Sequence, residues 1–356
     1  MSTVKASWSQ LSVDGAVLAH ATNLTGTMLA TSSSVPEGSS FVQVWVPDVA
    51  AADWMVKSVI QVPHPITTLA WAHPESGSLL AGASERGAVC VWEPPRPWQA
   101  TKPGQEQSAM ELQEEDLGDE DQEWQQNATL QCGVAPIRHI SFAPRQHGLL
   151  LSAASDDGCV RIWEAGRPLA PNSWTLVSQL QVATPRAKGG PGCTSMSWRC
   201  YSPGVPPSLV VGTADEAVVM QYVHAHMAWK KACSLKLSAP GRVASIHWAP
   251  CLGRPQDLVA AAHGSTVDIF SLQASSANGA LEAELHSSLA HDADVWKVEW
   301  NMLGTCLGTA TVSNRISVWR SNFVGEFSIV SAIQGCSKVA AEGSEAEGME
   351  EGGEVD

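Results

Sequence analysis

The chain has 356 residues, a formal net charge of −15 and 44% hydrophobic residues, which are spread along it in short runs. A domain of about 300 residues buries roughly 75% of its unfolded surface, so this composition predicts a core that needs no disulfide or metal for stability. The nine cysteines include no C-x-x-C pair, which argues against a disulfide framework and a zinc site. The opening residues, MSTVKASWSQ, lack the apolar segment of a secretory signal, and no stretch is apolar enough to predict direct membrane insertion.

The acidic residues are concentrated in two segments. Gly104–Trp124 contains nine acids and no base, and Gly335–Asp356 contains seven acids and one lysine. The rest of the chain is neutral and offers no electrostatic attraction to phosphate, which disfavours direct nucleic-acid binding. Such runs are typical of solvated, disordered segments that provide solubility and spacing, or that dock a basic partner.

In chain order, the sequence divides into a short leading segment, a long region of repeats and a tail. Residues 1–14 precede the repeats and are able to supply one extra strand that closes a ring. Residues 15–333 contain the repeats, interrupted by an acidic insertion at residues 94–127 that we expect to be disordered. Residues 334–356 form an acidic tail, also expected to be disordered.

The repeat unit is clearest in Ile137–Ala165, which reads IRHISFAPRQHGLLLSAASDDGCVRIWEA. Apolar and polar residues alternate in three runs, and Asp156-Asp157-Gly158 separates the second run from the third. Alternation with a period of two places one face of each strand on a core, and a glycine supplies the positive φ of a tight hairpin turn. The unit therefore predicts three antiparallel strands and two turns.

Five further copies of this unit follow one another along the chain. An aromatic residue ends the first strand of five copies and the third strand of all six. A fourth strand-like run stands between most copies, so we predict an all-β, six-bladed propeller of four-stranded antiparallel blades. The predicted blades are Ala16 to about Gln61, Ile66–Gln131, Ile137–Gln181, Cys193–Lys236, Val243–Leu289 and Val295 to about Ile329.

No set of residues predicts an active site, a metal site or a cofactor site. Asp156 and Asp157 sit at a turn, where an aspartate caps its own backbone. His224 and His226 are expected on one strand face without a third metal ligand. His291 precedes a blade and is expected to bond a Ser or Thr of the sheet. The sequence predicts a binding scaffold with no catalytic, cofactor-binding or metal-binding residues.

The repeats resemble the WD40 family, although they contain no Trp-Asp dipeptide and have Glu85, Asp157, Asp215 and Ser313 at or near the position of the turn acid. More narrowly, WAHPESGSLLAGASERGAVCVWE, GLLLSAASDDGCVRIWEA and APCLGRP resemble the Seh-type nucleoporins, which are homologues of the Sec-thirteen coat protein. The resemblance covers all six copies and is weakest in the first and the fourth.

This resemblance implies an open six-bladed propeller and a hetero-oligomer. A helical scaffold nucleoporin of the Nup-eighty-five type would insert strands between the first and the last blade as a seventh blade. The expected location is the Y-shaped outer ring of the nuclear pore complex in the nuclear envelope. The resemblance also implies a nutrient-signalling coat complex at the vacuolar or lysosomal surface. From position alone, we predict the partner contacts at Val17, Leu18, Trp296 and Val298.

Two other functions remain open at this stage. A coat subunit of COPII vesicles, like the Sec-thirteen protein, would share the fold and differ in its partner. A WD40 substrate receptor would have a closed ring that reads a peptide at its axial surface. An enzyme hosted on a propeller would need titratable groups that converge on that surface.

Overall fold

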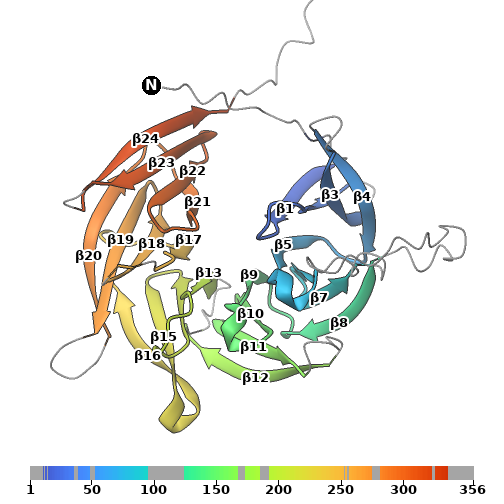
Figure 1. Cartoon of the computed structure of the whole chain (residues 1–356), viewed down its shortest axis with the longest axis horizontal. Helices are drawn as coiled ribbons and strands as arrows, with labels where there is room; N and C mark the ends of the chain where they lie inside the picture. Colours follow the sequence, from blue (N-terminus) through green and yellow to red (C-terminus); the bar gives the residue numbers. More distant parts are fainter. Residues whose placement is uncertain are drawn as a thin grey trace, which may run out of the picture.

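The computed structural model describes residues 11, 13, 15–35, 39–48, 53–94, 124–166, 173–184, 192–251, 253–254, 256–274, 281–322 and 325–335. These residues form six antiparallel sheets of four strands, and the strands of each sheet follow one another in sequence order. The sheets stand around a central axis as the blades of a propeller (Figure 1). The predicted fold class is confirmed.

The strands lie close to the predicted runs, and their bounds are as follows. Blade one contains β1 (Ala16–Thr22), β2 (Leu29–Ser34), β3 (Ser40–Asp48) and β4 (Asp53–Val62). Blade two contains β5 (Ile66–Trp71), β6 (Leu80–Ser84), β7 (Ala88–Glu93) and β8 (Gln125–Gln131). Blade three contains β9 (Ile137–Phe142), β10 (Leu150–Ser155), β11 (Cys159–Ala165) and β12 (Trp174–Gln181). Blade four contains β13 (Cys193–Trp198), β14 (Ser208–Thr213), β15 (Ala217–Val223) and β16 (Ala228–Leu235). Blade five contains β17 (Val243–Trp248), β18 (Asp257–His263), β19 (Thr266–Ala274) and β20 (Leu281–Ala290), and blade six contains β21 (Val295–Trp300), β22 (Cys306–Thr311), β23 (Arg315–Ser321) and β24 (Phe327–Gln334).

Three sequence expectations need correction at this level. Strand β8 begins at Gln125, inside the predicted acidic insertion, and β24 ends at Gln334, inside the predicted tail. His224 and His226 lie in a 3-10 turn between β15 and β16, not on a strand face, because the chain reverses direction there. Residues 95–123 and 336–356, and almost all of residues 1–14, lie outside the described residues, so the predictions for them stand as they were.

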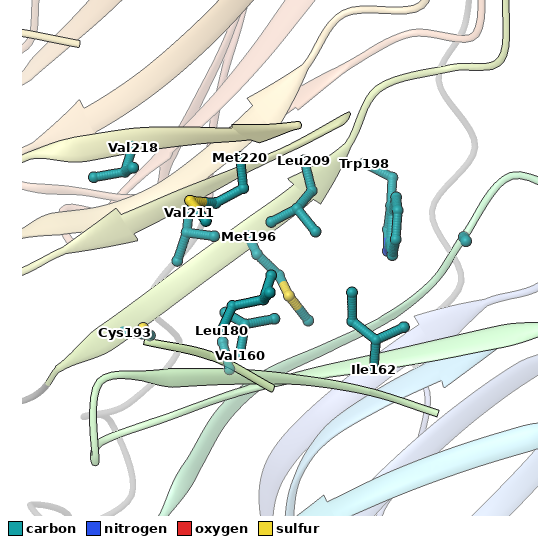
Figure 2. Packing of buried hydrophobic residues seen from close by; sticks show 12 residues of the cluster. Val160, Ile162, Leu180, Cys193, Met196, Trp198, Leu209, Val211, Val218 and Met220 are labelled. Atoms are coloured by element: carbon teal, nitrogen blue, oxygen red, sulfur yellow. The ribbon is translucent and has the colours of Figure 1, made fainter. Parts of the chain in front are cut away.

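The core consists of the junctions where one blade packs on the next. Figure 2 shows the junction between blades three and four, where Ile162 faces Met196 and Trp198. Comparable clusters join blade one to two, two to three, four to five and five to six. Each junction removes the apolar faces of two sheets from water, which is the main stabilising contribution available to strands of this length.

The turn of the clearest repeat has the predicted structure. Gly158 has a φ of 79°, the backbone N–H of Cys159 donates to Asp157 Oδ1 at 2.9 Å, and Arg161 bonds the same carboxylate at 2.7 Å. Asp157 therefore has the predicted role of stabilising the hairpin turn. His291 also has its predicted structural role, since its Nε2 lies 2.9 Å from Thr309 Oγ1.

Candidate partner-binding surface

The ring has five closed junctions and one open junction, between blade six and blade one. The innermost strands of consecutive blades contact each other from β1 to β5 and onward to β21, but no comparable contact among the described residues joins β21 to β1. In Figure 1 the blue strands of blade one and the red strands of blade six stand apart across this opening. The predicted open ring agrees with this arrangement.

The innermost strands can be compared position by position because each has a β-bulge at the same place. The register shifts between the first and third residues of this alignment, for example between Val17 and Ala19 in β1 and between Val295 and Lys297 in β21. After the bulge, the fourth and sixth positions face the preceding blade and the third and fifth face the following blade. The first position also faces the preceding blade.

Val17 occupies the first position in blade one and is 51% exposed. Its equivalents in the other five blades are 2% exposed or less: Ile66, Ile137, Cys193, Val243 and Val295. A side chain that is buried in every other blade is exposed here because no preceding blade covers it.

The fourth and sixth positions of blade one, which face the same side as Val17, are polar. His20 and Thr22 are exposed, whereas the equivalents of His20 are the buried apolar residues Leu69, Ile140, Met196, Ile246 and Val298. The equivalents of Thr22 are the aromatic residues that end the first strand in the other blades: Trp71, Phe142, Trp198, Trp248 and Trp300. We call the side of blade one that carries Val17, His20, Thr22, Gln43 and Trp45 the blade-one open face.

The middle of the blade-one open face is buried and polar. Trp45 donates from Nε1 to Thr31 Oγ1 at 2.8 Å, while Ser33 Oγ and Gln43 Oε1 have no hydrogen-bond partner. Buried polar side chains in native proteins usually have partners. Blade one therefore has unsatisfied hydrogen-bonding groups on the side where a further blade would pack.

Blade six has the complementary open face. Ile316 on β23 is 45% exposed, whereas the residues at the same register position in the other blades are fully buried: Val42, Val89, Val160, Ala217 and Val267. Lys297 and Glu299 on β21 are exposed on the same side. We call the side that carries Lys297, Glu299, Ile316, Val318 and Arg320 the blade-six open face.

The structure places the four predicted contact residues differently. Val17 and Leu18 are exposed, and Leu18 is the bulge residue of β1. Trp296 is 51% exposed, but it lines a pocket of ≈ 520 Å³ with residues of blade five, such as His263 and Thr266. Val298 is 1% exposed and packs in the junction with blade five, so it does not lie on either open face. The blade-six open face carries Ile316, Lys297 and Glu299, which position alone did not predict.

Two histidines that face the following blade stay neutral at physiological pH. Burial lowers the pKa of His247 to about 4, although the carboxylate of Glu299 opposes the shift and Lys297 adds to it. Burial, Lys297 and His247 lower the pKa of His139 to about 3. Neutral His247 accepts a hydrogen bond at Nδ1 from the N–H of Trp300 at 2.8 Å.

These shifts predict that acid destabilises the fold. The unfolded histidines bind protons near pH 6.5 and the folded ones do not, so the stabilisation is complete above pH 6.5 and is lost as the pH falls toward 4. We expect a loss of about 2 kcal/mol per histidine between pH 7 and pH 5, measured by denaturant unfolding. His247→Asn retains an acceptor and does not titrate. Between pH 7 and pH 5, this variant should therefore lose less free energy of unfolding than the parent protein. An equal loss in the variant and the parent would contradict the conclusion that His247 is neutral in the folded protein.

Neither a metal centre nor a membrane span emerges from the described residues. They contain no group of three or more His, Cys, Asp or Glu side chains placed to hold a metal ion. Their only helical segments are short 3-10 turns, and no helix there is long and apolar enough to cross a bilayer.

Comparison with known proteins adds two levels of similarity. The WD domain, G-beta repeat family matches residues 124–164, which run from Trp124 just before β8 through the first three strands of blade three. Nucleoporin SEH1 of Saccharomyces cerevisiae is 27% identical over 314 residues, covering 75% of this chain and 82% of the yeast protein. Nucleoporin SEH1 of Homo sapiens is 26% identical over 281 residues, covering 74% of this chain and 71% of the human protein.

Solved structures share the fold at low sequence identity. A protein from Lactobacillus plantarum aligns with a TM-score of 0.61 and 12% identity over 89% of this chain and 84% of its own. A chain of the mitotic checkpoint complex aligns with a TM-score of 0.58 and 16% identity over 87% of this chain and 76% of its own.

The six four-stranded blades define a β-propeller protein, and one stretch of it matches the WD domain, G-beta repeat. Over about three quarters of its length the chain is similar to the SEH1 nucleoporins, in agreement with the resemblance seen in the sequence.

Proposed function

We propose that the protein is a non-enzymatic scaffold subunit of the nuclear pore outer ring, and that a helical scaffold nucleoporin completes its propeller. The observation that carries the proposal is the exposure of Val17 at a position that is buried in the five other blades. The similarity to the SEH1 nucleoporins supports the nuclear pore as the location and other nucleoporins as the partners. Hetero-oligomer formation at the nuclear envelope follows from this proposal. The resemblance to the Seh-type nucleoporins supports a second proposed role, in a nutrient-signalling coat complex at the vacuolar or lysosomal surface.

A sheet is the occupant that best fits the open junction. Each closed junction packs one four-stranded sheet on another, so both open faces have the twist and spacing that accept a further sheet. Exposed sheet surfaces invite aggregation, and strands contributed by a partner would cover them. The occupant therefore belongs to the partner chain and acts as a seventh blade.

The first test is co-expression with a helical scaffold nucleoporin of the Nup-eighty-five type, followed by size-exclusion chromatography with light scattering. We expect a stable one-to-one complex, and aggregation of the chain when it is expressed alone. A lone chain that remains monomeric and does not bind this partner would overturn the proposal and favour the substrate-receptor function.

Substitutions on the two open faces should then weaken the complex. Val17→Asp and Ile316→Asp place a carboxylate where an apolar sheet face would be buried, and we expect each to weaken binding at least tenfold. Met227→Asp is the matched control, because Met227 is an exposed apolar residue in a turn of blade four. Thermal unfolding of the three variants checks that they fold. Normal binding by both open-face variants would contradict insertion of a blade at this junction.

A further inference from the structure

Hydrogen bonds from side chains to the backbone link the innermost strands of blades four, five and six. Ser195 Oγ accepts from the N–H of Ile246 at 3.1 Å, and Ser197 Oγ accepts from the N–H of Trp248 at 2.9 Å. The acceptors occupy the third and fifth positions of β13, and the donors are the fourth and sixth positions of β17. Each N–H points away from the strand's own sheet, so without these acceptors it would be left without a partner at the junction.

The same pattern recurs at the next junction. Ser245 Oγ accepts from the N–H of Val298 at 3.2 Å, and His247 Nδ1 accepts from the N–H of Trp300 at 2.8 Å. The two acceptor strands read Ser-Met-Ser-Trp at 195–198 and Ser-Ile-His-Trp at 245–248. Both alternate a hydrogen-bond acceptor with an apolar residue that packs on the preceding blade.

At the open junction both strands of this pattern are present without a neighbouring blade, but only one of the two acceptor positions holds an acceptor, Glu299. Lys297 and Glu299 occupy the acceptor positions of β21. His20 and Thr22 occupy the donor positions of β1, whose register with β2 repeats that of β17 with β18. Their backbone N–H groups therefore point out of blade one toward the opening.

The residue type at the third position distinguishes blade six from blades four and five. Direct packing of blade one on blade six would place the N–H of His20 against the ammonium group of Lys297. Both are donors, and a lysine has no acceptor. The serines at the same position of blades four and five accept a hydrogen bond, and Ala19 at this position of blade one packs on blade two without an acceptor. Lys297 is therefore a donor for which the occupant of the open junction must supply an acceptor.

We propose that the innermost strand of the inserted blade reads acceptor, apolar, acceptor, apolar, and that it binds through both sides of this hydrogen-bond pattern. Its two acceptor side chains receive the N–H groups of His20 and Thr22, and one of its own N–H groups donates to the carboxylate of Glu299. A backbone carbonyl or an acidic side chain of the same strand receives Lys297. This inference rests on the proposed function and specifies the sequence of the segment that enters the open junction.

The test uses the full chain in complex with the helical scaffold nucleoporin and measures amide hydrogen exchange at single-residue resolution. We expect the amides of His20 and Thr22 to exchange at least a hundredfold more slowly in the complex than in the free chain. The same amides would exchange equally in both if the partner bound elsewhere, or if its strand carried no acceptors. That result, with an intact complex, would overturn this inference and leave the scaffold function standing.

Variants of Glu299 provide the second measurement. Glu299→Leu removes the acceptor and should raise the Kd at least tenfold, whereas Glu299→Gln retains a weaker acceptor and should have a smaller effect. Glu284→Leu is the control, because Glu284 is exposed on the outer strand β20 of blade five. Equal Kd values for Glu299→Leu and Glu284→Leu would overturn the role of Glu299, and failure of the parent chain to form a complex would overturn both the inference and the proposed function.

Discussion

Replacement of Asp268 by alanine is expected to lower the free energy of unfolding by about 3–5 kcal/mol. Asp268 lies on β19 with 0% exposure. Its carboxylate accepts from the N–H of Ser238 at 2.6 Å, from Ser238 Oγ at 2.9 Å and from Ser288 Oγ at 2.6 Å, and it lies 2.9 Å from His263 Nε2. Truncation would leave these buried groups without a partner, which costs more than the net value of the bonds themselves.

The protonation state of Asp268 supports this large effect. Burial alone would raise the pKa of the carboxyl, but the hydrogen bonds from Ser238, Ser288 and His263 lower it below its usual value. The group is therefore ionised in the folded protein and tied to three other segments: the loop before β17, the end of β18 and the outer strand β20. Its loss should loosen blade five as a unit, and that blade forms the junction with blade six.

Urea unfolding of Asp268→Ala and Asp292→Ala provides the matched comparison. Asp292 is exposed and pairs with Arg315 at 3.4 Å, a surface ion pair worth at most about 1 kcal/mol. Asp268→Asn should fall between the two variants, because an amide keeps one acceptor oxygen. Similar losses for Asp268→Ala and Asp292→Ala would show that the buried network contributes little to stability.

The architecture could be predicted from sequence because each blade repeats a strong local signal. Short runs of alternating apolar and polar residues in Ile137–Ala165, with a glycine at the turn, indicate three antiparallel strands. The structure places strands at Ile137–Phe142, Leu150–Ser155 and Cys159–Ala165. The same signal, repeated six times, was enough to give the number of blades.

The residues on the two open faces could not be predicted by alternation because every innermost strand contains a bulge. Strict alternation would place Trp296 and Val298 on one face, but the register shift between Val295 and Lys297 moves Val298 to the face that packs on blade five. One extra residue in a strand reverses the facing of all residues after it. No single residue type in this segment predicts the bulge. It is identified from the pairing of β21 with β22.

Ile316 was missed for a different reason. It has the same chemistry and the same register position as Val267, which is fully buried against blade six. Local sequence predicts an apolar residue facing a neighbour in both cases. Only the absence of a following blade distinguishes them, and that is a property of the whole ring. The polar residues His20 and Thr22 in place of an apolar residue and an aromatic residue were the available signal for an unusual blade one.

Replacement of Gly158 by alanine is the second change expected to have a large effect. It should lower the free energy of unfolding by about 3 kcal/mol. Gly158 has a φ of 79°, where a side chain costs about 1 kcal/mol or more. A Cβ there would also lie 2.1 Å from the carbonyl oxygen of Ala183, a backbone atom that cannot rotate away. The Gly158 carbonyl accepts from the N–H of Val182 at 2.9 Å and of Ala183 at 3.1 Å, so the required shift would break the link between this turn and the end of β12.

Gly204→Ala separates the two causes of this loss. Gly204 has a φ of 76°, and a Cβ there would meet no atom within 4 Å, so its loss should be the backbone cost of about 1 kcal/mol alone. The difference between the two variants in thermal or urea unfolding measures the contact with Ala183. Equal losses of unfolding free energy would show that the loop after β12 can move away from the new Cβ at no cost. The Asp-Asp-Gly turn would then stabilise only its own hairpin. A larger loss for Gly158→Ala would show that this turn also holds the outer strand of blade three in place, so that a glycine recognised as a hairpin signal in the sequence has a second, non-local reason to be there.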